Sequence, residues 1–472
     1  MKTLSLSENI HWTEQSGLRR LLWAILLVVG AAFLGWNVAH EKWLLLAGLA
    51  GLPLLAMWPV PLALGVFVFL VPFDGVAVIG GKGGLALTFV AGGMAAVVLL
   101  VTGFLRRRLQ RPPITALWWA LFIAWGAITS LWAIDQDLAV HALPTAVGTL
   151  VLYVVASSVR ITREELNWVV LAAILGGVAA AAYSSHEFYS GVFYQATTAG
   201  RSSLIMGEEA MDPNVFAASL FLPLSLVVGR FFESRGWRRT LYLGMGGLIA
   251  VAIVLTMSRG AMLGLGAMIF IYFRRLGLDR RVLIPVAIVL LSLLVLPERF
   301  MVRLQNAESS GGAGRIYIWQ AGLASLKHYG LFGAGLHNFG EAYSQNIGAG
   351  TRVHRFGESD AHNDYLLLAV ELGPIGIGFM GLALVSALKA GRRLQDRVNQ
   401  RLANSLVSYE AAAAAMLTSS FFVGMFWRKA YWLVWIMYVL VLRVVSHEAD
   451  QVVEDPPAPL KVTRASQLVW NR

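Results

Sequence analysis

Apolar segments recur along almost the whole chain, and most are close to the 17–25 residues that a helix needs to cross a bilayer. Only 14% of the 472 residues are charged, whereas soluble proteins average about 25%. The apolar segments are continuous rather than alternating, which excludes a transmembrane β-barrel. The sequence therefore predicts an all-α, polytopic integral membrane protein with about 12–14 transmembrane helices. We expect a single transmembrane domain over residues 1–472.

The first apolar segment follows Arg19-Arg20 and is longer than the roughly 7–15 apolar residues of a signal peptide, so we expect it to be retained. The second and third are short and separated by Trp58-Pro59-Val60-Pro61, which allows a broken or re-entrant pair. The expected segments are residues 21–39, 43–58, 60–72, 85–104, 114–133, 143–159, 166–185, 215–232, 240–257, 261–273, 282–296, 364–388, 406–425 and 430–445.

Basic residues are unevenly distributed between the connections. A net charge of +11 would indicate nucleic acid binding in a soluble protein, but in a membrane protein Lys and Arg collect on the cytoplasmic side. This rule predicts that both termini are cytoplasmic and that the polar tail at 447–472 is a disordered cytoplasmic segment. The chain has no cysteine, so disulfides and thiolate metal sites are excluded. The basic residues that set this orientation are Arg106, Arg107, Arg108, Arg235, Arg238, Arg239, Arg274, Arg275, Arg280, Arg281, Lys389, Arg392 and Arg393.

Two polar loops fall on the outer side, at 186–214 and 297–362. Long loops in a protein of short connections are usually functional or disordered. The second loop contains apolar residues at helical spacing, which predicts an amphipathic helix on the outer membrane surface. Those apolar residues are Ile316, Trp319, Leu323 and Leu326.

Arg259 lies between two apolar segments, in Ser258-Arg259-Gly260. A cation at the membrane boundary is costly unless it is paired or functional. The alternative is that Arg259 is a membrane anchor whose side chain places its guanidinium group at the membrane surface. Because Gly260 permits close backbone approach, a tight turn can direct the guanidinium into a cavity.

His362 precedes an apolar segment that starts near Asp364. Asn363 or Asp364 is a good helix N-cap, and the positive end of the helix dipole disfavours a protonated imidazole there. A neutral histidine is what a general base needs, although a capping role for His362 is the alternative. Gly373-Pro374 downstream predicts a kink in this helix.

Arg315 and Arg201 belong to the two outer loops. Guanidinium groups bind phosphate oxygens in a bidentate manner, so arginines and a neutral histidine on the outer face suggest an anionic diphosphate substrate and a hydroxyl nucleophile. Lipid head groups are the alternative ligands of both arginines. No HExxH motif is present, and we expect no metal and no other cofactor.

Taken together, these residues resemble the superfamily of O-antigen ligases and O-antigen polymerases. The resemblance covers residues 200–385. Its motifs occur in the order Arg201…Asp212-Pro213-Asn214, Ser258-Arg259-Gly260, Arg315-Ile316-Tyr317-Ile318-Trp319, and His362-Asn363-Asp364-Tyr365-Leu366…Glu371-Leu372-Gly373-Pro374-Ile375-Gly376.

The ligase pattern is His, then Asn, Ser or Gln, nine residues, Gly, two residues, and Gly, Thr or Tyr. His362-Asn363 with Gly373 and Gly376 fits it, and so does His337-Asn338 with Gly348 and Thr351. Only His362 leads directly into a membrane helix, as the catalytic histidine of the family does, so we favour His362. His337 lies in a glycine-rich segment that resembles a loop of the family.

The resemblance implies a glycosyltransferase of the Gram-negative inner membrane, with a periplasmic active site and no metal. An undecaprenyl-diphosphate-linked glycan would be the donor and a sugar hydroxyl of lipid A–core the acceptor, with inversion at the anomeric carbon. His362 would act as general base and Arg259 and Arg315 would hold the diphosphate, with Arg201, His337 and Asn363 also binding substrate. The alternatives are an O-antigen polymerase, a protein O-oligosaccharyltransferase and, less favoured, a lipid-glycan transporter. The oligomeric state is left open.

Overall fold

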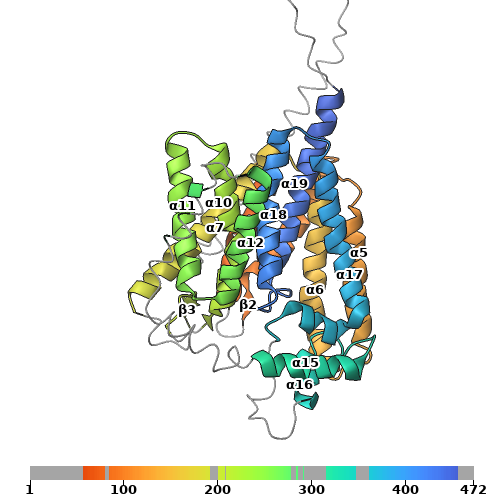
Figure 1. Cartoon of the computed structure of the whole chain (residues 1–472). Helices are drawn as coiled ribbons and strands as arrows, with labels where there is room; N and C mark the ends of the chain where they lie inside the picture. The colour runs from red at the N-terminus through yellow and green to blue at the C-terminus, as the bar shows by residue number, and fades with distance from the viewer. Residues whose placement is uncertain are drawn as a thin grey trace, which may run out of the picture. The chain divides into compact units, whose positions relative to one another are not determined.

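The computed structural model describes residues 57–79, 84–191, 200–207, 209–277, 315–346 and 361–454, with a few residues between 283 and 291 (Figure 1). The chain divides into two compact units, Met1–Leu62 and Ala63–Arg472. Nearly all the described residues belong to the second unit. The expected segments at 21–39 and 282–296, and most of 43–58, lie outside the described residues, so their helices and a single domain over 1–472 stay predictions.

Helices dominate the described residues, and the strands form two short antiparallel hairpins, β1–β2 and β3–β4. The strands are β1 (Val78–Ile79), β2 (Leu85–Ala86), β3 (Ile205–Met206) and β4 (Glu209–Ala210). The helices are α3 (Pro59–Leu70), the 3-10 helix η1 (Val71–Phe73), α4 (Leu87–Leu105), α5 (Ile114–Thr129), α6 (Gln136–Ser158), α7 (Arg163–Tyr189), α9 (Pro213–Ser219), α10 (Phe221–Glu233), α11 (Trp237–Leu255), α12 (Arg259–Leu276), α15 (Arg315–Tyr329), α16 (Phe339–Asn346), α17 (Asp364–Gln395), α18 (Gln400–Ser419) and α19 (Lys429–Glu454).

Among the described residues, seven helices are long and apolar enough to cross a membrane. They are Leu87–Leu105, Gln136–Ser158, Arg163–Tyr189, Pro213–Glu233, Trp237–Leu255, Asp364–Gln395 and Lys429–Gln451. Two shorter apolar helices cover Pro59–Phe73 and Ile114–Thr129. The chain is therefore an all-α, polytopic membrane protein, as predicted.

Helix α19 lies at the centre of the bundle. Of its apolar span 83% is buried inside the protein, against 22% for α6. Helix α18 packs along α12, α10 and α19, and α17 packs along α5 (Figure 1). Aromatic rings fill the contact between α5 and the start of α19, where Trp119 and Trp432 lie 4.8 Å apart between ring centroids. These contacts hold the helix ends described below in fixed positions.

Several predicted helix boundaries are wrong, and at two of them a polar contact lies in the extension of the helix. Helix α6 begins at Gln136 rather than at 143, since the Asp135 carboxylate accepts hydrogen bonds from the first turn. Helix α7 continues through Tyr189, so the loop predicted at 186–214 starts later. Helix α19 continues to Glu454, where Arg163 of α7 binds Glu448 at 2.8 Å, and residues 447–454 are helical rather than disordered.

The helix predicted in the long loop is present as α15, and the face that it buries against the protein consists of small residues. Ala321, Gly322 and Ser325 are buried, whereas Ile316 and Leu323 are 49% and 55% exposed. The small residues allow close packing on α16 and α17, because a Cβ atom at Gly322 would lie 2.9 Å from Leu366. The loop also contains the short helix α16, which was not predicted.

Candidate active site

His362 immediately precedes α17, and its position is set by the cap of that helix. The Asn363 side chain accepts hydrogen bonds from the backbone N–H groups of Tyr365 at 3.0 Å and Leu366 at 3.1 Å. Asn363 is thus the predicted N-cap. His362 is half-buried and has a backbone φ of 47°, in the left-handed region that few non-glycine residues adopt. The cap of α17 therefore fixes the backbone at His362, from which the imidazole side chain extends.

Asp364 attaches the start of α17 to the turn between α18 and α19. This turn, residues Ser420–Arg428, is called the α18–α19 turn below. The buried Asp364 carboxylate accepts from the N–H groups of Met425 at 2.9 Å and Phe426 at 3.0 Å. Its own N–H donates to the carbonyl of Ser420 at 2.8 Å. The His362 segment and this turn therefore form one hydrogen-bonded unit.

Arg259 is the first residue of α12 and is exposed. The Ser258 hydroxyl accepts from the Ala261 N–H at 3.3 Å and caps the helix. A Cβ atom at Gly260 would lie 2.8 Å from the Cβ of Phe422, so glycine is required for this approach to the α18–α19 turn. The turn thus contacts both the Arg259 segment and the His362 segment.

Arg201 holds the backbone just before Arg259. Its Nε donates to the carbonyl of Thr256 at 2.8 Å, and its Nη2 donates to the side-chain oxygen of Asn214 at 2.8 Å. Asp212 caps α9 through the N–H groups of Asn214 and Val215. Arg201 therefore connects the outer loop, the start of α9 and the end of α11.

Arg315 is the first residue of α15, and it is half-buried. One turn further along, the indole N–H of Trp319 donates to the carbonyl of Ala361 at 3.1 Å. Ala361 is fully buried and immediately precedes His362. This bond brings the first turn of α15 beside the His362 segment, so Arg315 and His362 belong to neighbouring parts of the structure.

His337 belongs to a separate structure, the loop that covers the kink of α17. Gly373 has φ 65°, and Pro374 has no N–H, so the helix is interrupted there. The carbonyls of Val370 and Glu371 then accept from the N–H groups of Ala334 and Gly335, at 2.8 and 2.9 Å.

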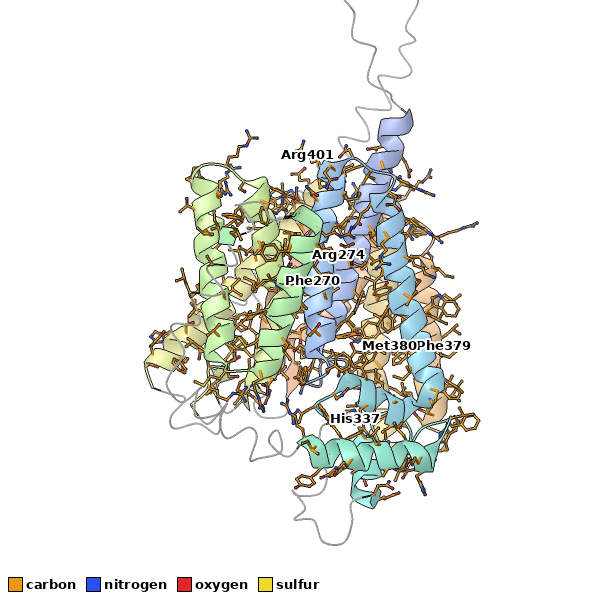
Figure 2. All side chains as sticks on the ribbon, in the orientation of Figure 1. Phe270, Arg274, His337, Phe379, Met380 and Arg401 are labelled. Atoms are coloured by element: carbon orange, nitrogen blue, oxygen red, sulfur yellow. The ribbon has the colours of Figure 1, made fainter. Side chains whose placement is uncertain are left out.

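The side chain after His337 fixes this loop to the connection between α5 and α6. Asn338 is fully buried, and it accepts from the Asp135 N–H at 2.6 Å and donates to the Asp135 carbonyl at 2.9 Å. Hydrogen bonds to Asp135 and to α17 therefore fix the backbone of the glycine-rich segment. His337 itself is exposed, with φ 59° (Figure 2). Its loop attaches to α17 at Val370 and Glu371, about 11 Å of helix beyond Asn363.

A cation that the sequence reasoning missed lies in the α18–α19 turn. Arg428 is exposed, and neither Arg428 nor Arg259 has an ion pair or side-chain hydrogen bond within the described part of the chain. The adjacent Lys429 is different, because its ammonium group binds Asp74 at 2.8 Å and both side chains are largely buried. The sequence did offer one indication of Arg428. The basic pair Arg428-Lys429 belongs to a connection that is predicted to lie on the outer side, whereas most Lys and Arg residues are predicted to be cytoplasmic.

The carboxylates of Asp212 and Asp364, at this end of the bundle, are each occupied by two backbone N–H groups. Within the described residues, no three His, Asp or Glu side chains are grouped as metal ligands. The candidate site therefore has guanidinium groups that can bind an anion and an imidazole that can accept a proton.

A comparison with protein families gives one match. A family model described as O-Antigen ligase matches residues 244–381. No curated protein matches the chain in a sequence search. The matched region includes Arg259, Arg315, His337 and His362, and it leaves out Arg201. This match over residues 244–381 supports the assignment of the chain to the O-antigen ligase superfamily.

Proposed function

We propose that this protein is an O-antigen ligase of the Gram-negative inner membrane. In this proposal it is a glycosyltransferase that takes a glycan from undecaprenyl diphosphate and transfers it to a sugar hydroxyl of lipid A–core at the periplasmic face. The histidine pattern at His362-Asn363 favours ligase over polymerase.

The observation that carries the proposal is the shared contact with the α18–α19 turn. Gly260 contacts the turn at Phe422, and Asp364 binds it at Met425 and Phe426. Two exposed guanidinium groups, Arg259 and Arg428, are attached to the same unit as His362. A diphosphate carries two phosphate groups, and guanidinium groups bind such oxygens with charge-assisted hydrogen bonds.

Backbone conformation also supports this location. Among the described non-glycine residues with positive φ are Met257, at 51°, and His362, at 47°. One lies two residues before Arg259 and the other is the proposed base. Residues in sparsely populated backbone regions cluster at active sites, where the surrounding structure holds them.

The proposed reaction is a single inverting displacement. The imidazole of His362 removes the proton from the acceptor hydroxyl as its oxygen bonds to the anomeric carbon of the donor glycan. The bond between that carbon and the diphosphate oxygen breaks, and undecaprenyl diphosphate leaves with the electron pair. Arg259 and Arg315 offset the negative charge that develops on the leaving oxygen. The donor is already activated, so the reaction needs no nucleotide, and we propose that it needs no metal.

The other predicted site residues have supporting roles in this proposal. Arg201 uses two of its guanidinium nitrogens on Thr256 and Asn214, so it positions the Arg259 segment in addition to any contact with substrate. The Asn363 side-chain oxygen caps α17, which leaves its amide nitrogen to bind an acceptor sugar. His337 is exposed on its loop and is assigned to acceptor binding.

Analysis of lipopolysaccharide by gel in a deletion strain tests the proposal. Loss of O-antigen-bearing lipopolysaccharide, with long polymer accumulating on the lipid carrier, is the expected result, and the wild-type gene on a plasmid restores the ladder. Loss of the polymer itself would identify a polymerase instead. Unchanged lipopolysaccharide with glycan missing from a periplasmic protein would identify a protein O-oligosaccharyltransferase.

A further inference from the structure

A cleft of about 940 Å³ lies at the end of the bundle opposite the candidate site. It is formed where α7 and α18 begin and where α10 and α12 end, with α19 beside them. Figure 2 shows Arg401, which lines the cleft, and His337 towards opposite ends of the bundle. Helix α18 runs from Gln400 to Ser419, and at 1.5 Å per residue it separates the two sites by about 30 Å.

The carboxylates of the cleft are already paired. Glu448 binds Arg163 at 2.8 Å, and Glu233 binds Arg230 at 3.0 Å. Arg401 also lines the cleft, is exposed, and has no side-chain hydrogen bond or ion pair with any described residue. Once the two pairs are formed, the cleft therefore carries a net positive charge centred on Arg401.

The amide side chains of the cleft are set to donate. The Asn167 oxygen accepts from Arg230 at 2.6 Å, and the Asn404 oxygen accepts from Gln400 at 2.8 Å. Each amide oxygen is thus occupied, and each NH₂ group remains a hydrogen-bond donor. A cation together with amide donors suits the oxygens of a phosphate group.

The lining of the cleft also includes the apolar side chains of Phe232, Leu276 and Val407. Phe232 lies at the end of a helix that is long and apolar enough to cross a membrane, and the ends of such helices are where lipid head groups meet acyl chains. A soluble phosphate would use only the polar side chains of the lining, whereas an amphiphile would contact the polar and the apolar ones. We propose that this cleft binds the head group of an anionic phospholipid, with its phosphate on Arg401.

The test uses purified full-length protein and native mass spectrometry with dioleoylphosphatidylglycerol or dioleoylphosphatidylcholine. The wild type is expected to retain phosphatidylglycerol preferentially. Arg401→Gln removes one charge-assisted contact and is expected to weaken that binding by roughly tenfold or more. Arg397→Gln is the matched control, because Arg397 is exposed near the same helix end, outside the residues that line the cleft, and should bind lipid as the wild type does.

Asn404→Asp supplies a second variant, which places a carboxylate in the cleft and should also weaken phosphatidylglycerol binding. Equal lipid binding by the wild type and both cleft variants would overturn the proposal. An equal loss in Arg397→Gln would also overturn it, since binding would then follow surface charge alone. Inorganic phosphate that displaces the lipid at equal concentration would show that the site takes soluble phosphate, and would overturn the assignment to a lipid.

Discussion

Asp364 is the residue on which the geometry of the candidate site most depends. Its carboxylate accepts two N–H groups from buried residues of the α18–α19 turn. Asp364→Ala leaves both donors without this acceptor, at a cost of about 1–3 kcal/mol for each buried group. We expect a lower unfolding temperature in detergent and a large loss of ligation, whereas Asp364→Asn keeps one oxygen acceptor and should lose much less. An alanine variant as stable and active as the asparagine variant would show that the turn does not depend on this contact.

Arg259 offers a test of phosphate recognition. The planar guanidinium binds phosphate through two parallel hydrogen bonds, which an ammonium group cannot reproduce. Arg259→Lys keeps the charge and should lose most ligation in a purified assay with lipid-linked donor. Arg235→Lys, an exposed arginine outside the candidate site, serves as the control and should be fully active. Near-normal ligation by Arg259→Lys would reduce Arg259 to an electrostatic anchor.

His362 and His337 are separated by substitution with asparagine. Both have positive φ, and asparagine tolerates that region better than alanine does. A general base contributes about 10²–10⁴-fold in rate. His362→Asn should therefore lose ligation by that factor while still binding donor, and His337→Asn should lose less. A normal rate for folded His362→Asn, with an inactive His337→Asn, would transfer the role of base to His337.

At the scale of residues, the sequence identified those whose role follows from local rules. An N-cap at Asn363 or Asp364 follows from local rules, and the structure confirms it at Asn363. The contact of Asp364 with Phe426 joins residues far apart in the chain, and no local pattern reveals it. Arg428 was missed for the same reason, since only the folded turn places it in the same unit as His362.

At the scale of elements, the kink of α17 depends on Gly373. At φ 65°, a Cβ atom at this position would lie 2.2 Å from the carbonyl oxygen of Leu331. Gly373→Ala should therefore lower the free energy of unfolding by at least about 1–2 kcal/mol, from the left-handed backbone alone. Gly378→Ala in the same helix is the control. Its Cβ meets nothing within 4 Å, and it should stabilise by about 0.4–1 kcal/mol.

Thermal unfolding of the two purified variants measures this difference. Equal unfolding temperatures would mean that the kink forms without glycine. The sequence predicted this kink from Gly373-Pro374, because proline always removes one helical hydrogen bond. It did not predict that Ala334 and Gly335 supply the missing donors, since their partners lie on another element.

At the scale of the whole molecule, hydropathy was sufficient for the fold class. Apolar length determines which segments can cross a membrane, and the seven spanning helices follow that rule. Hydropathy failed at helix ends such as Asp135 and Glu448, where side-chain hydrogen bonds and ion pairs extend helices into polar sequence. Hydropathy also does not show which face of α15 packs on the protein, because that face consists of the small residues Ala321, Gly322 and Ser325, and size rather than polarity allows close packing there.

Membrane orientation is the prediction that concerns the molecule as a whole. The candidate site and the arginine-rich helix ends lie at opposite ends of the bundle, so the charge rule places the site in the periplasm. The chain has no cysteine, so single cysteines report without background. Ala324→Cys on the exposed face of α15 should react with an impermeant maleimide in cells whose outer membrane is permeabilised. Asp396→Cys, exposed at the opposite end, should react only after the inner membrane is lysed. The reverse labelling pattern would place the candidate site in the cytoplasm, and this would contradict the proposed transfer to lipid A–core at the periplasmic face.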